Sequence, residues 1–109
     1  MAVSRWYSEG QKVNPAANDL LADTGAFKPS VNKTFKVLVS SSAAASIQLQ
    51  HRDSANTTTL RSQLIHVVAL TPLTIDPMVN GITLGENERF RVVVDTTLVG
   101  TIQASIFHD

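Results

Sequence analysis

The stretch Phe-Lys-Val-Leu-Val-Ser at residues 35–40 has the clearest β-strand pattern in the sequence. Phe35, Val37 and Val39 occupy every second position in it. Successive side chains of a β-strand point to opposite faces, so a period of two predicts a strand with one buried face. We therefore expect a β-strand here.

The pattern continues towards the C-terminus. Further alternating or apolar runs lie at residues 47–50, 60–68, 73–75, 82–84, 90–94 and 102–106. Val93 breaks the alternation in the fifth of these runs, which indicates a strand covered on both faces. The last run is apolar at Ile102, Ala104 and Ile106, so we expect it to lie inside a sheet and not at an edge.

Turn residues separate these runs. Asn80-Gly81 between apolar residues predicts a hairpin, because both turn positions need a positive φ. Pro77 lacks an N–H group, which places its segment at a sheet edge. Residues 40–46 are small and form either an open connection or one helical turn. Together the runs predict an all-β protein, an antiparallel β-sandwich or jelly roll of seven to eight strands.

The N-terminal residues 1–19 show neither a helical nor a strand period. We expect an irregular, extended N-terminal arm here, followed by the β-sandwich domain at residues 20–109. Trp6 and Tyr7 are the only Trp and Tyr in the chain. Large aromatic side chains on an arm are suited to insert into a partner's pocket. The alternative is that they fold back and cover the protein's own core.

The composition limits the kinds of partner. Lys and Arg number nine, as do Asp and Glu, so no net field attracts nucleic acid or an anionic membrane. No run approaches the roughly 20 apolar residues of a membrane span, and no secretory signal follows Met1. Charged residues make up 17% of the chain, against about 25% in typical soluble domains. We infer that other subunits cover part of the surface, since interfaces are depleted in charge.

Few residues suggest chemistry. The chain has no cysteine, which suits a reducing compartment and excludes disulfides and thiolate chemistry. His51 and Asp53 are two residues apart and share a strand face, but no nucleophile or third metal ligand accompanies them. His66 is interpreted as a partly buried imidazole with a hydrogen-bond partner, or as an ion ligand near a symmetry axis. His108 and Asp109 at the terminus make a poor metal site. We expect no catalytic, cofactor or metal site.

The densest charge cluster lies on a turn and the strand that follows it, and consists of Glu86, Glu88, Arg89 and Arg91. It is either a solvated edge or the rim of an interface, where opposite charges set register and specificity. Together with Trp6 and Tyr7, these four residues are our candidates for partner binding. The Thr-rich loop at residues 57–59 is a further surface that a partner or a sugar could contact.

Four segments carry a resemblance to a known group of proteins. They are IQLQHRD at 47–53, ANTTTL at 55–60, LxxNERFRV at 84–92 and GTIQAS at 100–105. In the order and sequence of these strand and turn segments, the chain resembles the small head decoration, or cement, proteins of tailed bacteriophages. The resemblance covers about residues 35–107. It implies a jelly roll like that of tumour necrosis factor, a homotrimer, and attachment to the major capsid protein on the capsid surface. The resemblance also implies a virion protein that is made in the host cytoplasm.

The sequence therefore suggests a structural virion protein that stabilises the phage head and not an enzyme. The main alternative is a receptor- or carbohydrate-binding head module of a phage fibre or tail, because a sandwich can present Thr, Asn and Gln loops to sugars. An enzyme that uses His51 or Asp53 ranks third.

Overall fold

The computed structural model describes residues 5–27, 31–33, 35–75 and 82–108. Within these residues it contains ten β-strands and no helix, which confirms the all-β prediction. The strands are β1 (Arg5–Val13), β2 (Leu20–Asp23), β3 (Val31–Lys33), β4 (Phe35–Ser41), β5 (Ala45–Arg52), β6 (Thr59–Val67), β7 (Leu73–Ile75), β8 (Ile82–Leu84), β9 (Arg89–Val94) and β10 (Thr101–His108). No helix in this part of the chain is long and apolar enough to cross a membrane.

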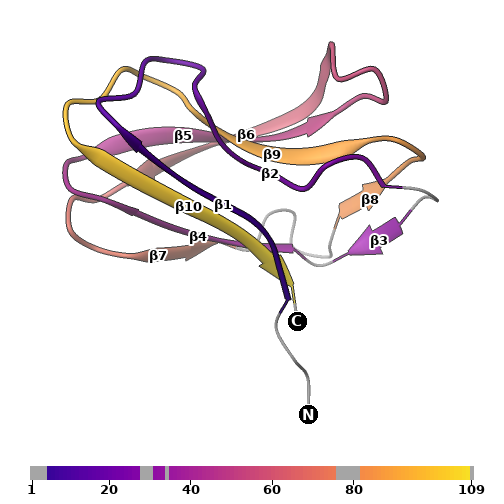
Figure 1. Cartoon of the computed structure of the whole chain (residues 1–109), viewed down its shortest axis with the longest axis horizontal. Coiled ribbons are helices and arrows are strands. Elements are labelled where there is room, and N and C mark those ends of the chain that lie inside the picture. The colour runs from indigo at the N-terminus through magenta and orange to yellow at the C-terminus, as the bar shows by residue number, and fades with distance from the viewer. Residues whose placement is uncertain (1–4, 28–30, 34, 76–81, 109) are drawn as a thin grey trace.

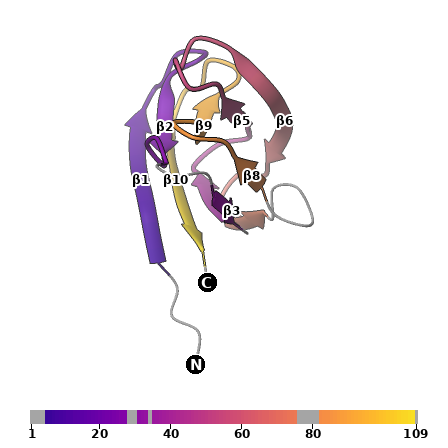
Figure 2. The ribbon, with the colours of Figure 1, turned by 90° about the vertical axis from the view of Figure 1, so that its right-hand side faces the viewer.

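Eight of the strands form two four-stranded sheets. The order is β1-β10-β4-β7 in one sheet and β2-β9-β5-β6 in the other, and β3 and β8 form a separate pair. Every pairing is antiparallel. The two sheets lie one over the other as two layers (Figures 1 and 2). The predicted antiparallel β-sandwich is therefore present.

The pairing follows a simple rule along the chain. Strands counted from opposite ends pair with each other: β1 with β10, β2 with β9, β3 with β8, β4 with β7, and β5 with β6. The chain is thus one long antiparallel ribbon that doubles back between β5 and β6. Two further pairs, β10 with β4 and β9 with β5, join turns of the ribbon and complete the two sheets.

The core lies between the sheets and takes side chains from both. Alternate residues of β4 and β9 point inward, and Phe35, Val37, Phe90 and Val92 are fully buried. The rings of Phe35 and Phe90 stack at 5.6 Å and 12°, so an aromatic contact ties one sheet to the other. Each such buried apolar side chain stabilises the fold by about 1.5–3 kcal/mol.

Two details of the strand predictions are confirmed. Val93 points away from the core yet is only 2% exposed, so β9 is covered on both faces at this position. The last strand, β10, lies between β1 and β4 and so is interior to its sheet.

The prediction of an irregular N-terminal arm was wrong for residues 5–13, which form β1 along the edge of a sheet. The register places Ser8, Gly10 and Lys12 opposite the buried Ile106, Ala104 and Ile102 of β10. Because small or polar residues occupy these positions of an edge strand, no apolar period marks it. The register also shifts between Trp6 and Ser8, which disturbs any alternation.

The hairpin expected at Asn80-Gly81 lies, together with Pro77, outside the described residues. The strands on either side of it do not pair with each other, because β7 joins β4 and β8 joins β3. The connection at residues 40–46 is shorter than expected and is not helical. Strand β4 runs to Ser41 and β5 begins at Ala45, which leaves only residues 42–44 between them.

Candidate interaction surfaces

Four connections gather at one end of the sandwich, which we call the loop end (at the left in Figure 1). They are residues 14–19, 42–44, 68–72 and 95–100. Backbone hydrogen bonds join them to one another and to strand ends. The N–H of Asn14 donates to the carbonyl of Gly100 at 2.7 Å, and the N–H of Leu70 donates to the carbonyl of Ser41 at 2.8 Å. The loop end is therefore built as one surface.

Apolar side chains project from this surface. Val13 and Val68 are each 67% exposed, Leu70 is 81% exposed and Val99 is 84% exposed. A single exposed apolar residue is ordinary on a soluble protein, but several at one end of a molecule favour an interaction site. The loop end is thus the first candidate surface.

Two hollows flank the 68–72 connection. One has a volume of about 510 Å³ and is lined mainly by small apolar residues, which are Ala44, Ala45, Val67, Val68 and Ala69, with Ser46, His66 and Thr96. The other has a volume of about 280 Å³ and is lined by Gln11, Ser40, Ser41, Ser42, Thr101 and Gln103, with Leu70 and Pro72. The first hollow suits an apolar side chain, and the second offers hydroxyl and amide groups.

The outward side of the sheet β1-β10-β4-β7 carries little charge. Its outward positions follow from the register with the buried inward residues and comprise Glu9, Gln11, Val13, Lys36, Leu38, Ser40, Thr74, Thr101, Gln103, Ser105 and Phe107. Among these described residues only Glu9 and Lys36 are charged. We call this surface the neutral face. Its composition resembles the core of a protein interface, where charged residues are depleted.

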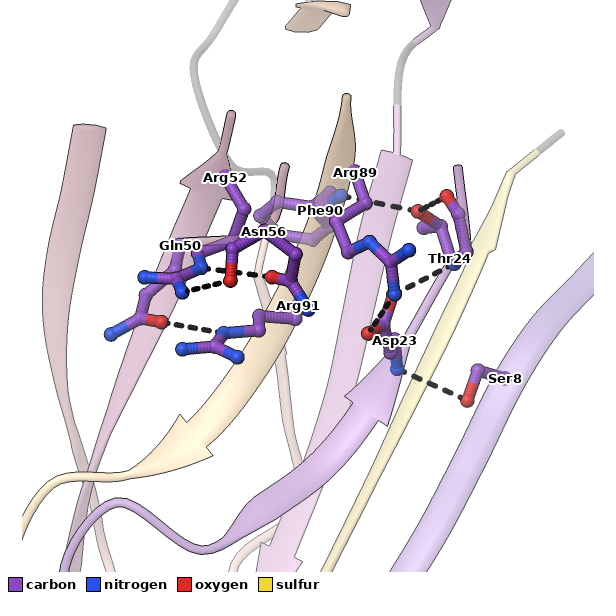
Figure 3. A network of polar contacts seen from close by, with 10 residues as sticks. Ser8, Asp23, Thr24, Gln50, Arg52, Asn56, Arg89, Phe90 and Arg91 are labelled. Atoms are coloured by element: carbon purple, nitrogen blue, oxygen red, sulfur yellow. Dashed lines mark hydrogen bonds and ion pairs between the residues drawn. The ribbon is translucent and has the colours of Figure 1, made fainter. Parts of the chain in front are cut away.

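The outward side of the other sheet differs sharply. Arg52 of β5 lies directly opposite Arg89 of β9, and Arg91 lies opposite Gln50. We call this surface, centred on the three arginines, the arginine face (Figure 3). Nε of Arg91 donates to Gln50 at 2.7 Å, and Nη1 of Arg89 lies 3.1 Å from a carboxylate oxygen of Asp23.

Arg52 is held by the connection that follows its own strand. Its guanidinium donates to the carbonyl of Asn56 at 2.7 Å and to the hydroxyl of Thr59 at 2.8 Å. Asp53 stabilises the same connection because its carboxylate accepts the N–H of Thr57 at 2.8 Å. That backbone hydrogen bond lowers the pKa of Asp53 below its ordinary value.

The predicted charge cluster divides in the structure. Arg89 and Arg91 point outward on the arginine face, whereas Glu88 turns back to accept the N–H of Gly85 at 2.6 Å. Glu88 also lies 2.9 Å from Nε2 of the buried His51. The Gly85 N–H, followed by the His51 contact, lowers the pKa of Glu88. Glu86 is exposed on the turn itself.

Among the described residues, His51 and His66 contact separate partners. His51 bonds to Glu88, while Asp53 faces Thr57, so these two residues do not converge. His66 has the expected partner, Ser46 at 3.0 Å, but the side chain is exposed, so the expected burial was wrong. The side chain of His108, all of Asp109 and the side chains of Trp6 and Tyr7 lie outside the described part of the structure. Among the described residues, no three His, Cys, Asp or Glu side chains form a group that could hold a metal.

Two residues that sequence reasoning missed belong to these surfaces. Arg52 joins the arginine face only through the β5–β9 register, which its own neighbours in the sequence do not reveal. Leu70 projects from the loop end with a positive φ of 60°. The one sequence signal near Leu70 was the following Thr-Pro, which marks a turn without indicating which side chain projects from it.

Comparison with known proteins gives no family for this sandwich. No model of a protein family matches the sequence, and no curated protein matches it either. The molecule is thus defined by its own geometry, as a small β-sandwich with a neutral face, an arginine face and an apolar loop end.

Proposed function

We propose that the chain is a structural virion protein: a homotrimeric decoration protein that binds the major capsid protein on the outer surface of a tailed-phage head and stabilises the head. The observation that carries the proposal is the apolar loop end on an otherwise well-packed sandwich. Four connections that hydrogen-bond to one another or to strand ends present side chains up to 84% exposed. Such a surface costs solubility unless a partner covers it.

The strand order supports the jelly-roll part of the proposal. A jelly roll is a double sheet of eight antiparallel strands with Greek-key connections. A ribbon in which strands from opposite ends pair, and which then rolls into two four-stranded sheets, generates this arrangement. The small pair β3 and β8 continues the same ribbon between its larger segments.

The neutral face supports self-association. A patch of Gln, Ser, Thr and Leu side chains with only two charged residues can be covered by another subunit without burying unpaired charge. We assign this face to contacts between copies of the chain and the loop end to the capsid. Many weak contacts on a repeating lattice then give tight binding overall.

A non-catalytic role is consistent with the histidine geometry. His51 and Asp53, the pair that an enzyme would use, are engaged separately by Glu88 and by Thr57. Their contacts stabilise two turns at one end of the sandwich.

The proposal has a direct test in two stages. Light scattering of the purified chain is expected to give three times the chain mass of 11.8 kDa. Heads of the phage that encodes the chain, purified without it, are then mixed with the protein and sedimented. We expect the protein to sediment with the heads and to raise the temperature at which they rupture. A stable monomer that leaves the heads unchanged would overturn the proposal.

A carbohydrate-binding head module is the second candidate, and one observation favours it. The hollow of about 280 Å³ is lined by side chains that can hydrogen-bond a sugar, including Gln11, Ser42, Thr101 and Gln103. None of the described residues that line it is aromatic, although sugar sites usually stack a ring on an aromatic side chain. A specific hit on a glycan array, lost in Gln103→Ala, would place this function first.

A further inference from the structure

The arginine face brings positively charged side chains together, and their mutual repulsion does not help the chain to fold. Arg52 and Arg89 lie directly opposite each other on neighbouring strands, and like charges in that position destabilise a sheet. Arg91 adds a third positive charge on the same side. The whole chain has equal numbers of positive and negative residues, so acidic partners for all three exist elsewhere in the sequence. A local conflict of this kind is typical of a functional site.

The partners already present do not satisfy these arginines. Among the described residues, Asp23 is the one carboxylate that forms an ion pair with them, through Nη1 of Arg89. Nε of Arg89 is buried and has no hydrogen-bond partner among the described residues. In the same part of the structure Arg91 uses only Nε, which donates to the neutral side chain of Gln50. The Nη groups of Arg91 and the positive charge of the three arginines therefore remain available on this surface, whereas Nε of Arg89 is buried beneath it.

The electrostatics agree with this geometry. Partial burial, followed by repulsion from Arg52, lowers the pKa of Arg91 below its ordinary value. The guanidinium groups are also held in place by Gln50, Asn56 and Thr59, so little side-chain freedom is lost when an anion binds.

The surroundings favour an acidic protein segment over other anions. Leu64 lies beside this surface, opposite Gln48, and is 51% exposed. An apolar neighbour suits a peptide that carries apolar side chains between its carboxylates. Nucleic acid needs a broad basic surface that neutralises many phosphates. The arginine face is not such a surface, because Asp23 and Asp95 lie at its borders and the chain has no net charge.

We propose that the arginine face binds an acidic segment of a partner protein, whose Asp or Glu carboxylates pair with the guanidinium groups of Arg89 and Arg91. Arg52 contributes positive charge beside them, and Leu64 offers an apolar contact. The planar guanidinium group can bind a carboxylate through two parallel hydrogen bonds. This site does not depend on the proposed attachment to a phage head, because it lies on a sheet face and not on the loop end.

The test uses the whole chain and a synthetic peptide of ten glutamates. NMR signals of the arginine side-chain Nε–H groups are followed during titration at low salt, and affinity is measured by fluorescence anisotropy. We expect the Arg89 and Arg91 signals to move, with affinity falling between 50 and 200 mM salt. Arg91→Gln is expected to weaken binding by roughly fivefold or more, since a charge-assisted pair is lost.

Two further variants make the outcome specific. Lys12→Gln removes the same charge from the exposed residue Lys12 of β1 in the other sheet, and it is expected to change affinity by less than about twofold. Arg91→Lys keeps the charge but loses the planar group, so an intermediate loss is expected. Equal losses in Arg91→Gln and Lys12→Gln would overturn the site. Binding of inorganic phosphate or of a thymidine decamer as tight as that of the peptide would overturn the choice of partner.

Discussion

Leu70 has a backbone conformation that its side chain disfavours. The described non-glycine residues with positive φ are Asn14, Asn18, Asn56, Asn87 and Leu70. Asparagine tolerates the left-handed region, whereas for other residues this region costs roughly 1–2 kcal/mol. Leu70 is 81% exposed, so burial does not compensate for this strain. A strained, exposed leucine at the loop end is more consistent with a contact residue than with a role in folding.

The substitution Leu70→Asn separates strain from function. Asparagine relieves the backbone strain, so the free energy of unfolding should rise by about 0.5–1 kcal/mol, measured by urea denaturation. The proposed binding to phage heads should weaken at the same time. Val99→Asn is the matched control, because Val99 is 84% exposed and has no positive φ. It should weaken binding without a gain in stability. A less stable Leu70→Asn protein would contradict this account.

Glu88 gives the fold a dependence on pH. Its pKa in the folded state lies below the ordinary value of 4.5, because the Gly85 N–H and His51 stabilise the carboxylate. This stabilisation is complete above the unfolded-state pKa and is lost as the pH falls through the lower, folded-state pKa. Thermal melts between pH 7 and pH 3 should therefore show a smaller loss of stability for Glu88→Gln than for the unmodified chain.

Glu86→Gln is the control for this prediction. Glu86 lies on the same turn but is exposed. Its substitution should leave the difference in melting temperature between pH 7 and pH 3 unchanged. If Glu88→Gln loses as much stability on acidification as the unmodified protein, Glu88 does not contribute in the way that its contacts indicate.

At the scale of elements, β1 connects the two sheets at one edge of the sandwich. Its N–H and carbonyl groups pair with β10, while Gly10 lies against the backbone of Leu21 in β2. A Cβ atom at position 10 would collide with the carbonyl oxygen of Leu21. Removing residues 1–19 would therefore take away a strand and not merely an arm, so a truncation cannot test Trp6 and Tyr7 as anchors.

Gly10→Ala tests the position of β1. Backbone atoms cannot move aside as a flexible side chain can, so the free energy of unfolding should fall by roughly 1–3 kcal/mol. Hydrogen exchange should also become faster for the β10 amides that face β1, since the edge pairing loosens. Gln63→Ala, at an exposed position of the edge strand β6 in the other sheet, should change stability by less than about 0.5 kcal/mol. Equal effects of the two substitutions would show that β1 does not approach β2 closely.

At the scale of the whole molecule, the sandwich is flat, with extents of 39 × 37 × 20 Å. The outward sides of its two sheets differ in chemistry, because one is almost uncharged among the described residues and the other carries three arginines. A sandwich with two unlike outer surfaces can contact copies of itself through one and a different partner through the other.

Gln103→Lys tests whether the neutral face forms the contact between copies. Gln103 is exposed and lies opposite Gln11 and Ser40, so a lysine should not disturb the isolated chain. Burying its charge between the copies of the proposed trimer is costly, so light scattering should show the mass fall from three chains to one. Gln63→Lys makes the same change at an exposed position of β6 and should leave the mass unchanged. A trimer that persists in Gln103→Lys would place the contact elsewhere.

The amino-acid pattern was enough to predict the strands that carry an apolar period, from β4 onward, and the buried side chains of β4 and β10. Alternation of apolar residues is local, and in β4 and β10 it correctly marked Val37, Val39, Ile102 and Ile106 as inward. It did not reveal β1, because an edge strand with Ser8, Gly10 and Lys12 at its inward positions leaves no apolar period. The prediction was thus confirmed for those strands in which one face is apolar and buried.

Which strands are neighbours follows from tertiary packing, and the composition of each surface depends on it. The cluster of Glu86, Glu88, Arg89 and Arg91 was continuous in sequence, but Glu88 turns to His51 while Arg89 comes to lie opposite Arg52. Leu70 likewise reaches the loop end because four distant connections meet there. Strand pairing joins residues that are far apart in the chain, and its register follows from packing between whole sheets. A local pattern carries no information about that packing. The arginine face was therefore not predicted, because it forms only through the pairing of β5 with β9.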